Sequence, residues 1–296
     1  MASQPLPQAA VLGPVPALGR FLVFGMQPGV DPHAALQRLR GEHALDHGVL
    51  GIGAPLALAV GAKVPGLRSF PAVAGPGVAL PSTQGALWAF LGGDGAGDLH
   101  DRAERIKHAA GEGFFVQEEV AAFRYAEGRD LSGYVDGTAN PQGAGAVAAA
   151  IVAGRGPGLD GGSFVAVQKY VHDLERFAGF AAPERDRIVG RRHSDNEEMT
   201  DAPPSAHVKR AEQEAFDPPA FMVRRSMPWG GVGERGLYFV AYGESLDRFE
   251  RVLARMAGCD DGVVDGLFRF TRAISGGYYF CPPTKDGQVD WTALGL

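Results

Sequence analysis

The chain has 296 residues, of which 45% are hydrophobic, so it is long enough to bury one large core or two smaller ones. The formal net charge is −6 and no polybasic run is present, which argues against nucleic acid or an anionic membrane surface as a partner. No apolar run reaches the ~18 residues that a membrane span requires, and residues 1–16 lack the features of an export signal. Cys259 and Cys281 form no CxxC pair, which fits a reducing compartment, and we expect a cytoplasmic protein.

The first half of the chain follows an N-terminal arm, residues 1–16, that we expect to be loose. Short apolar runs predict strands at 20–26, 49–53, 56–60, 86–91 and 114–125. Amphipathic spacing predicts two helices, 31–39 and 98–110. Asp31 is expected to cap the first of them, with Pro32 at its first position.

The second half repeats this order of elements. Strands are predicted at 163–171, 220–226, 236–242 and 270–280. Helices are predicted at 173–182, 183–189 and 245–256, the last with Ser245 as its N-cap. The stretch 190–219 is long and polar, and loops of that length are typically functional or disordered.

Strand, helix, strand, strand, helix, strand is the order of a split βαβ, or ferredoxin-like, unit. Because the order occurs twice, we predict an α+β protein with two ferredoxin-like domains, each built on an antiparallel sheet. The Gly- and Ala-rich segment 141–162 lies near a natural boundary. We therefore divide the chain into residues 17–135 and 136–296.

One candidate for chemistry is Asp136, which lies in the run Gly133-Tyr134-Val135-Asp136-Gly137. Asp-Gly is also an ordinary turn dipeptide, so a plain loop remains an alternative. Two apolar residues precede the carboxylate, however, and would carry it inward. Glycines on both sides would let the backbone approach a flat ligand closely.

His207 and Arg224 are the other two candidates. His207 follows a proline-containing turn, and no His/Cys cluster accompanies it that could build a zinc site, so a metal held by this side chain alone would be haem iron. The alternative is an ordinary surface or core histidine. In an extended strand, Arg224 shares one face with Met222 and Ser226 while Arg225 lies on the other. One arginine then points into a pocket, unless the strand is an edge strand with both side chains in solvent.

Several segments, in order, resemble those of the dye-decolorising peroxidases, especially the compact bacterial subgroup. The resemblance extends over nearly the whole chain from about residue 17, and the segments that carry it are 129–141, 162–170, 205–208, 224–230, 236–239 and 270–280. Two positions depart from the family pattern. Ala139 stands where a glutamate is usual, and Ser226 stands where many members carry asparagine.

The resemblance implies one b-type haem per chain, held mainly by the C-terminal half. It assigns His207 as axial ligand, Asp136 as distal acid and Arg224 as distal cation. Asp265 would accept the proton of the other nitrogen of the axial histidine. The remaining positions that it places at the cofactor are Gly137, Thr138, Arg191 and Ser226.

The expected function is therefore reduction of hydrogen peroxide with oxidation of dyes, phenols or similar one-electron donors. We expect a homo-oligomer, dimeric or larger. Electrons would pass through surface aromatic residues, with Tyr170, Tyr238, Tyr242 and Trp291 as candidates. Two alternatives are a haem-handling protein that stores haem, delivers it or releases its iron, with incidental peroxidase activity, and a ferredoxin-like binding module without haem.

Overall fold

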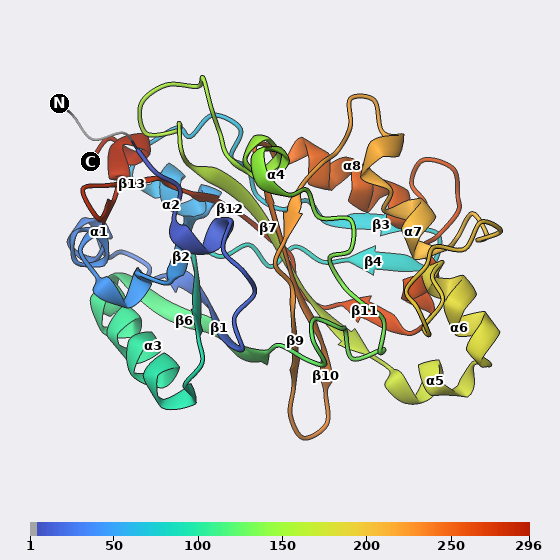
Figure 1. Cartoon of the computed structure of the whole chain (residues 1–296). Coiled ribbons are helices and arrows are strands. Elements are labelled where there is room, and N and C mark those ends of the chain that lie inside the picture. The colour runs from blue at the N-terminus through green and yellow to red at the C-terminus, as the bar shows by residue number, and fades with distance from the viewer. Residues whose placement is uncertain (1–4) are drawn as a thin grey trace.

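Within residues 5–296, ten of the strands form one antiparallel sheet that closes on itself, and two further pairs, β3-β4 and β13-β14, are separate (Figure 1). The computed structural model describes residues 5–296. Going around the closed sheet, the order is β7-β12-β2-β5-β1-β6-β9-β10, and β10 pairs with β7 to complete the ring. The ring strands are β1 (Leu18–Met26), β2 (Gly48–Ile52), β5 (Leu87–Gly93), β6 (Phe114–Phe123), β7 (Ser163–His172), β9 (Met227–Gly230), β10 (Arg235–Gly243) and β12 (Gly277–Cys281).

Each half of the chain contributes four neighbouring strands to this ring. The N-terminal half has the order β2-β5-β1-β6 and the C-terminal half the order β12-β7-β10-β9, which in both cases is the ferredoxin-like arrangement. The prediction of an α+β protein with two ferredoxin-like units is thus confirmed. The halves join at only two places in the ring, through the single registered pairs Phe280 with Ile52 and Ala122 with Trp229.

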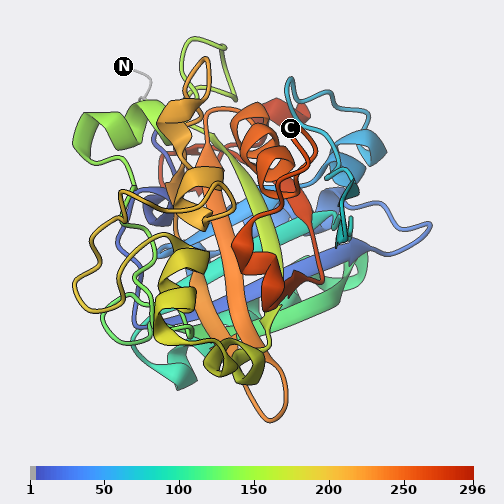
Figure 2. The same cartoon turned by 90° about the vertical axis from the view of Figure 1, so that its right-hand side faces the viewer.

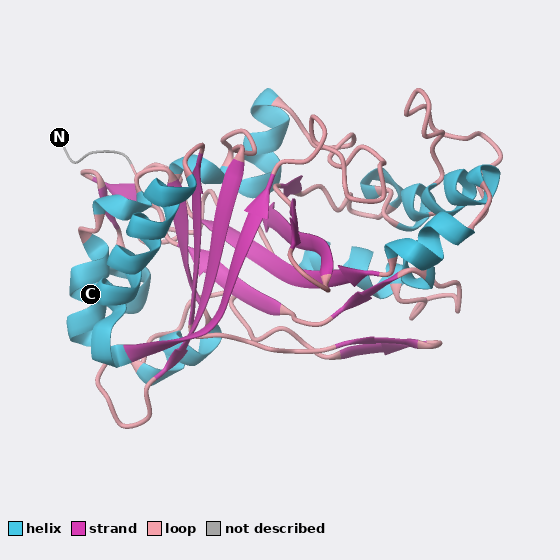
Figure 3. Ribbon diagram, turned by 90° about the horizontal axis from the view of Figure 1, so that it is seen from below, coloured by secondary structure: helices cyan, strands magenta, loops and turns pink. Residues whose placement is uncertain are grey.

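Most helices cover the outside of the ring, whereas α4 (Gly143–Ala150) packs its buried alanines against the core inside it. In Figure 1, helices α1 and α3 lie to the left of the strands and α5, α6 and α8 to the right. Figure 2 faces the right-hand group, and Figure 3 shows from below that helices lie at both ends with strands between them. The helices are α1 (His33–Arg40), α2 (Ala54–Ala59), α3 (Ala96–Ala110), α4 (Gly143–Ala150), α5 (Leu174–Gly179), α6 (Ala182–Val189), α7 (His207–Arg210) and α8 (Asp247–Met256). The remaining short strands are β3 (Val73–Gly75), β4 (Val78–Leu80), β8 (Val223–Arg224), β11 (Thr271–Ala273), β13 (Thr284–Lys285) and β14 (Gln288–Val289).

Alternation along the strands produces two apolar layers. One face of the ring strands packs inside the ring, where Phe21 stacks on Tyr238 with ring centroids 4.0 Å apart and Trp88 donates a hydrogen bond to the Tyr238 hydroxyl. The other face packs beneath the helices. Because successive residues of a strand point to opposite faces, Leu237 and Phe239 point outward when Tyr238 points inward. That outward face forms part of the cavity described below.

Both ends of the chain pack across the two halves. Trp291 is fully buried and its indole nitrogen donates to the Leu36 carbonyl at 3.0 Å. Gln8 is also buried, and its amide bonds to the backbone of Leu50 and Pro282. The N-terminal arm, expected to be loose, is therefore ordered over residues 5–16, and residues 1–4 of it lie outside the described part. The domain boundary between residues 135 and 136 stays a prediction.

Local sequence signals failed in a few places. Residues 56–60, predicted as a strand, belong mostly to α2, because Pro55 starts a helix of Ala and Leu residues. The caps of α1 and α8 are Pro32 and Leu246, not Asp31 and Ser245. The predicted strands 220–226 and 270–280 are each shorter and interrupted. Among residues 5–296, no helix is long and apolar enough to span a membrane.

We predict that Gly236→Ala destabilises the protein. A Cβ atom at Gly236 would lie 2.0 Å from the Tyr170 carbonyl oxygen of the paired strand, so β7 and β10 would have to separate. We expect a loss of about 1–3 kcal/mol in the free energy of unfolding, measured by denaturant titration. Gly97→Ala is the matched control, because a Cβ there meets nothing within 4 Å and alanine favours helix α3. A Gly236→Ala protein as stable as the control would contradict the close approach of these strands.

Candidate active site

The main cavity lies on the outer face of the C-terminal half of the ring. Its empty volume is about 740 Å³, and all of its lining residues fall between 136 and 271. Strands β7, β8 and β10 supply one wall and helix α8 another. Most of the surface is apolar, with Leu237, Phe239, Phe249, Leu253, Met256 and Phe268 among the lining side chains. A large apolar cavity with a few converging polar groups is typical of a cofactor or substrate site.

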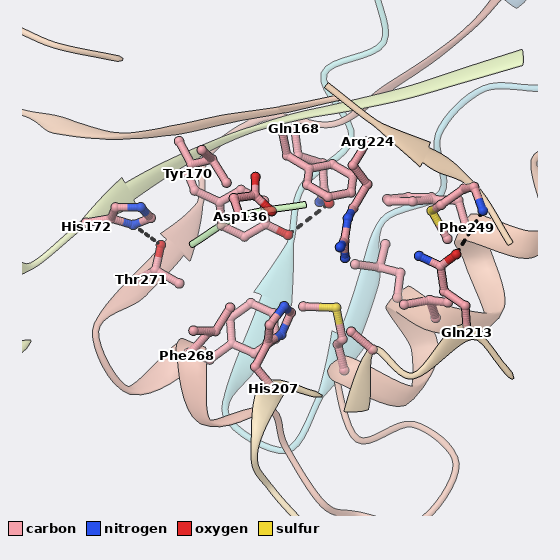
Figure 4. A pocket seen from close by; sticks show the side chains of 18 residues that line it. Asp136, Gln168, Tyr170, His172, His207, Gln213, Arg224, Phe249, Phe268 and Thr271 are labelled. Atoms are coloured by element: carbon pink, nitrogen blue, oxygen red, sulfur yellow. Dashed lines mark hydrogen bonds between the residues drawn. The ribbon is translucent and has the colours of Figure 1, made fainter. Parts of the chain in front are cut away.

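The sequence-predicted residues Asp136, His207 and Arg224 all line this cavity. Figure 4 shows Asp136 and Arg224 on one side of it and His207 on the opposite side. The strand alternation expected for the two adjacent arginines also holds at this point. Arg224 lines the main cavity, whereas the Arg225 guanidinium donates to the carbonyls of Leu12 and Gly13 in the N-terminal arm.

Asp136 is held by the turn-rich loop that follows β6. Tyr134 is buried, and its hydroxyl donates to Asp186 of α6 at 2.5 Å, which fixes the approach to the carboxylate. The Asp136 amide donates to the Gly128 carbonyl at 3.1 Å. Gly137 has a φ of +77°, which a side chain would strain, so the glycine after the aspartate lets the chain turn away from the cavity.

Asn140 joins this loop to the strand that carries Arg224. Its side-chain nitrogen donates to the Arg224 carbonyl at 3.0 Å, and its side-chain oxygen accepts from the Arg224 amide at 2.9 Å. Both backbone groups of Arg224 are thus bound by one side chain from the loop of Asp136. The sequence placed Asn140 in the family-like segment 129–141 without a role of its own, and no local signal shows a partner that is 84 residues away.

His207 is oriented by a buried carboxylate. It begins α7, and its Nδ1 lies 2.8 Å from Oδ2 of Asp265, whose side chain has no exposed surface. The other oxygen of Asp265 accepts from the Leu267 amide, so the carboxylate is fixed from both sides. With Nδ1 engaged, Nε2 is the ring nitrogen left to bind a ligand in the cavity. No group of three or more His, Cys, Asp or Glu side chains that could hold a metal occurs within residues 5–296.

Two polar atoms at the cavity lack a protein partner. Nε of Arg224 and Nε2 of Gln168 are both buried without a hydrogen bond in the described chain. Gln168 uses its oxygen to accept from the Tyr170 hydroxyl at 2.9 Å. Burial, together with the negative charge of Asp265, raises the pKa of Tyr170, so this hydroxyl stays protonated and acts as a donor. Unpaired buried donors are costly and indicate a bound group at this place.

A second pair of a histidine and an aspartate, His172 and Asp130, borders the cavity and was not predicted. His172 lies between Thr271 Oγ1 at 2.7 Å and Asp130 Oδ1 at 3.0 Å. Burial would raise the pKa of Asp130, but hydrogen bonds from His172 and Ser132 outweigh it and hold that pKa below its ordinary value. Asp130 lies in the loop of Asp136, so the pair anchors the loop to strands β7 and β11.

The other sequence-predicted residues lie at neighbouring cavities. Gly137, Thr138 and Arg191 line a side cavity that shares Asp136, His207 and Arg224 with the main one. Arg191 bonds within its own loop, to the Asn196 carbonyl and to Glu198. Ser226 does not reach the main cavity, because β8 ends at Arg224 and the alternation breaks there. The Ser226 hydroxyl instead accepts from the Val240 amide.

The aromatic residues expected to relay electrons at the surface are not at the surface. Tyr170, Tyr238, Tyr242 and Trp291 are all buried, the most accessible of them being 8% exposed. Tyr238 and Tyr242 point into the core of the ring, and Trp291 packs against α1. The expectation of surface relays at these positions was wrong, because the ring interior covers Tyr238 and Tyr242, while Tyr170 is buried at the main cavity and Trp291 beside α1.

Comparisons with known proteins agree with this geometry. The family model described as "Dyp-type peroxidase, C-terminal" matches residues 127–286. A dye-decolorizing peroxidase of Mycolicibacterium paratuberculosis is 30% identical, and the match covers 94% of this chain and 84% of that protein. A DypB variant from Rhodococcus jostii, solved in complex with heme, is 30% identical with a TM-score of 0.87, covering 94% of this chain and 97% of the other.

A third relative is the encapsulated DyP-type peroxidase from Mycobacterium smegmatis, which is 28% identical with a TM-score of 0.84. The match covers 95% of this chain and 96% of that one. The likeness thus extends over both ferredoxin-like halves and is not confined to the cavity. Full-length coverage, together with the family model, identifies the chain as a member of the DyP-type peroxidase family.

Proposed function

We propose that this protein is a haem-dependent peroxidase in which Asp136 and Arg224 act on hydrogen peroxide opposite His207. One observation carries the proposal: a carboxylate and an arginine whose buried Nε has no partner among the described residues lie across a single cavity from a histidine whose Nδ1 is bound to a carboxylate. Storage or delivery of haem requires the histidine but no carboxylate–guanidinium pair. The pair therefore favours the enzyme over the haem-handling alternative.

The cavity fits a haem group. Its walls are mostly apolar, and two buried polar atoms in it, Nε of Arg224 and Nε2 of Gln168, have no partner in the described chain, as expected where a cofactor binds. His207 would bind the iron through Nε2, while Asp265 accepts the Nδ1 proton and strengthens the imidazole as a ligand. Gly137, Thr138 and Arg191 border the side cavity, where the charged edge of the group would lie. Ser226 remains a predicted contact only.

The chain's own residues would supply proton transfer and charge stabilisation. A bound haem iron supplies the redox chemistry of peroxide cleavage. The Asp136 carboxylate accepts a proton from one oxygen of hydrogen peroxide and returns it to the other. The Arg224 guanidinium stabilises the negative charge that grows on the departing oxygen, and it is already in place before the reaction. The apolar walls exclude water and strengthen both interactions.

The reductants that we propose are dyes, phenols and similar one-electron donors. We also predict one b-type haem per chain, a homo-oligomer and a cytoplasmic location.

We predict that His207→Ala weakens haem binding by about tenfold to a hundredfold or more, because the iron loses its protein ligand. The measurement is the haem content and the absorption spectrum of the protein after reconstitution with haem. His100→Ala is the control, since His100 is exposed on α3, away from the cavity. A His207→Ala protein with the haem content and spectrum of the wild type would place the ligand at another residue.

We predict that Arg224→Leu slows the reaction with hydrogen peroxide by about 10²–10³-fold, the usual cost of losing one preorganised charge donor. Stopped-flow measurement of the haem spectrum after mixing with peroxide gives the rate. Arg225→Leu is the comparison variant, because the Arg225 guanidinium bonds to the N-terminal arm and does not line the main cavity. Equal slowing in the two variants would remove the special role proposed for Arg224.

A further inference from the structure

A second cavity, here called the arginine cavity, lies beside the distal pair. Its empty volume is about 540 Å³, and it shares Asp136 and Arg224 with the main cavity. Three further arginines line it: Arg124 after β6, Arg129 in the loop of Asp136, and Arg225 after β8. Four arginines thus line this cavity, and Asp136 is the one carboxylate residue among its described lining residues.

These four arginines form no ion pair with a carboxylate within residues 5–296, whereas several other arginines do. Arg68, for comparison, pairs with Asp247 and Glu250. Within residues 5–296, Arg129 and Arg225 bond only to backbone carbonyls, and Nε of Arg224 is buried without a partner. Arg124 is exposed and makes no side-chain hydrogen bond to the rest of the described chain.

The charge in this cavity is unusual for the protein. The chain as a whole has a net charge of −6, so acidic residues are in excess. Burial lowers the pKa of Arg225, which reflects the cost of removing this cation from water without an anion beside it. A bound anion would offset that cost, since guanidinium pairs with carboxylate oxygens through two parallel hydrogen bonds.

The rest of the lining indicates an aromatic ligand rather than a small inorganic ion. Val15, Pro228 and Leu237 provide apolar surface, and Tyr125, with 41% of its surface exposed, offers a ring against which a flat ligand can stack. An inorganic oxyanion would pair with the arginines but would make no contact with these apolar residues. A hydroxylated aromatic acid would use both.

We propose that the arginine cavity binds aromatic anions, in particular phenolic carboxylates, as the electron donors of the peroxidase. This inference rests on the proposed function and specifies its substrate class. In each turnover two phenol molecules each lose one electron and the hydroxyl proton to become phenoxyl radicals. The two electrons and two protons reduce one hydrogen peroxide to two waters. The carboxylate stays bound to the arginines throughout and takes no part in the redox step.

The test compares 4-hydroxybenzoate with its neutral methyl ester as donors for the haem-loaded protein. We expect Arg124→Gln and Arg129→Gln each to raise the ratio of the KM for the acid to the KM for the ester by about tenfold, the loss of one charged hydrogen bond. Arg235→Gln is the control, because Arg235 is exposed on β10 and lines neither cavity. It should leave the ratio unchanged.

A second readout is independent of turnover. Calorimetric titration of benzoate, which is not oxidised here, should show binding to the protein that weakens about tenfold in the same two variants. Inorganic phosphate should bind more weakly than benzoate. A wild-type KM ratio that does not change in either variant, or phosphate binding as tight as benzoate binding, would overturn the proposal. If neither donor is oxidised at all, the proposed function fails, and the benzoate titration still decides whether the cavity binds aromatic anions.

Discussion

Two hydrogen bonds between the Asn140 side chain and the backbone of Arg224 join the loop that carries Asp136 to the strand that carries Arg224. Asp136 comes from a loop after the N-terminal half of the ring, whereas Arg224 comes from a two-residue strand at the edge of the C-terminal half. A strand of this length has few hydrogen bonds of its own to hold it. The loop therefore sets where Arg224 lies, and the strand in turn sets where Asp136 lies.

The ring explains why such a connection is required. At each of the two junctions between the ferredoxin-like halves of the described chain, only one residue pair is in register. Strand pairing therefore contributes little to holding one half against the other. The loop after β6 crosses from one half to the other and carries several anchors, including the Tyr134 bond to Asp186 and the Asp130 bond to His172. On the far side of the cavity, Asp265 holds His207 in the same manner. His207 is thus positioned by a buried carboxylate, and the backbone of Arg224 by the half-buried side chain of Asn140.

Much of this arrangement could be predicted from the sequence, and the failures have definable causes. Strands β7 and β10 are long apolar runs, so their type and face followed from alternation. The segment 56–60 is equally apolar, and only Pro55 at the start of α2 distinguishes it from a strand. Alternation put Arg224 and Arg225 on opposite faces, and the family resemblance selected Arg224. The same alternation does not extend to Ser226, because β8 ends at Arg224.

Long-range contacts account for what the sequence could not show. Asn140 is a residue type that is common in turns, and its partner Arg224 lies 84 residues further along the chain, on β8. The arginine cavity combines residues of the arm, the loop and β8, which are distant in the chain, so no local charge run reveals it. Closure of the ring likewise buries the tyrosines that, in an open sheet, could have reached the surface.

The central claim is that Asp136 and Arg224 act as one unit because Asn140 holds them together. The most direct measurement is the rate of reaction with hydrogen peroxide for Asn140→Ala in two backgrounds, wild type and Asp136→Asn. A misplaced catalytic group can cost up to about 100-fold in rate, and residues that act as a unit are not additive. We therefore expect Asn140→Ala to slow the wild-type reaction strongly and the Asp136→Asn reaction little. Slowing by the same factor in both backgrounds would show that Asn140 does not couple the two residues.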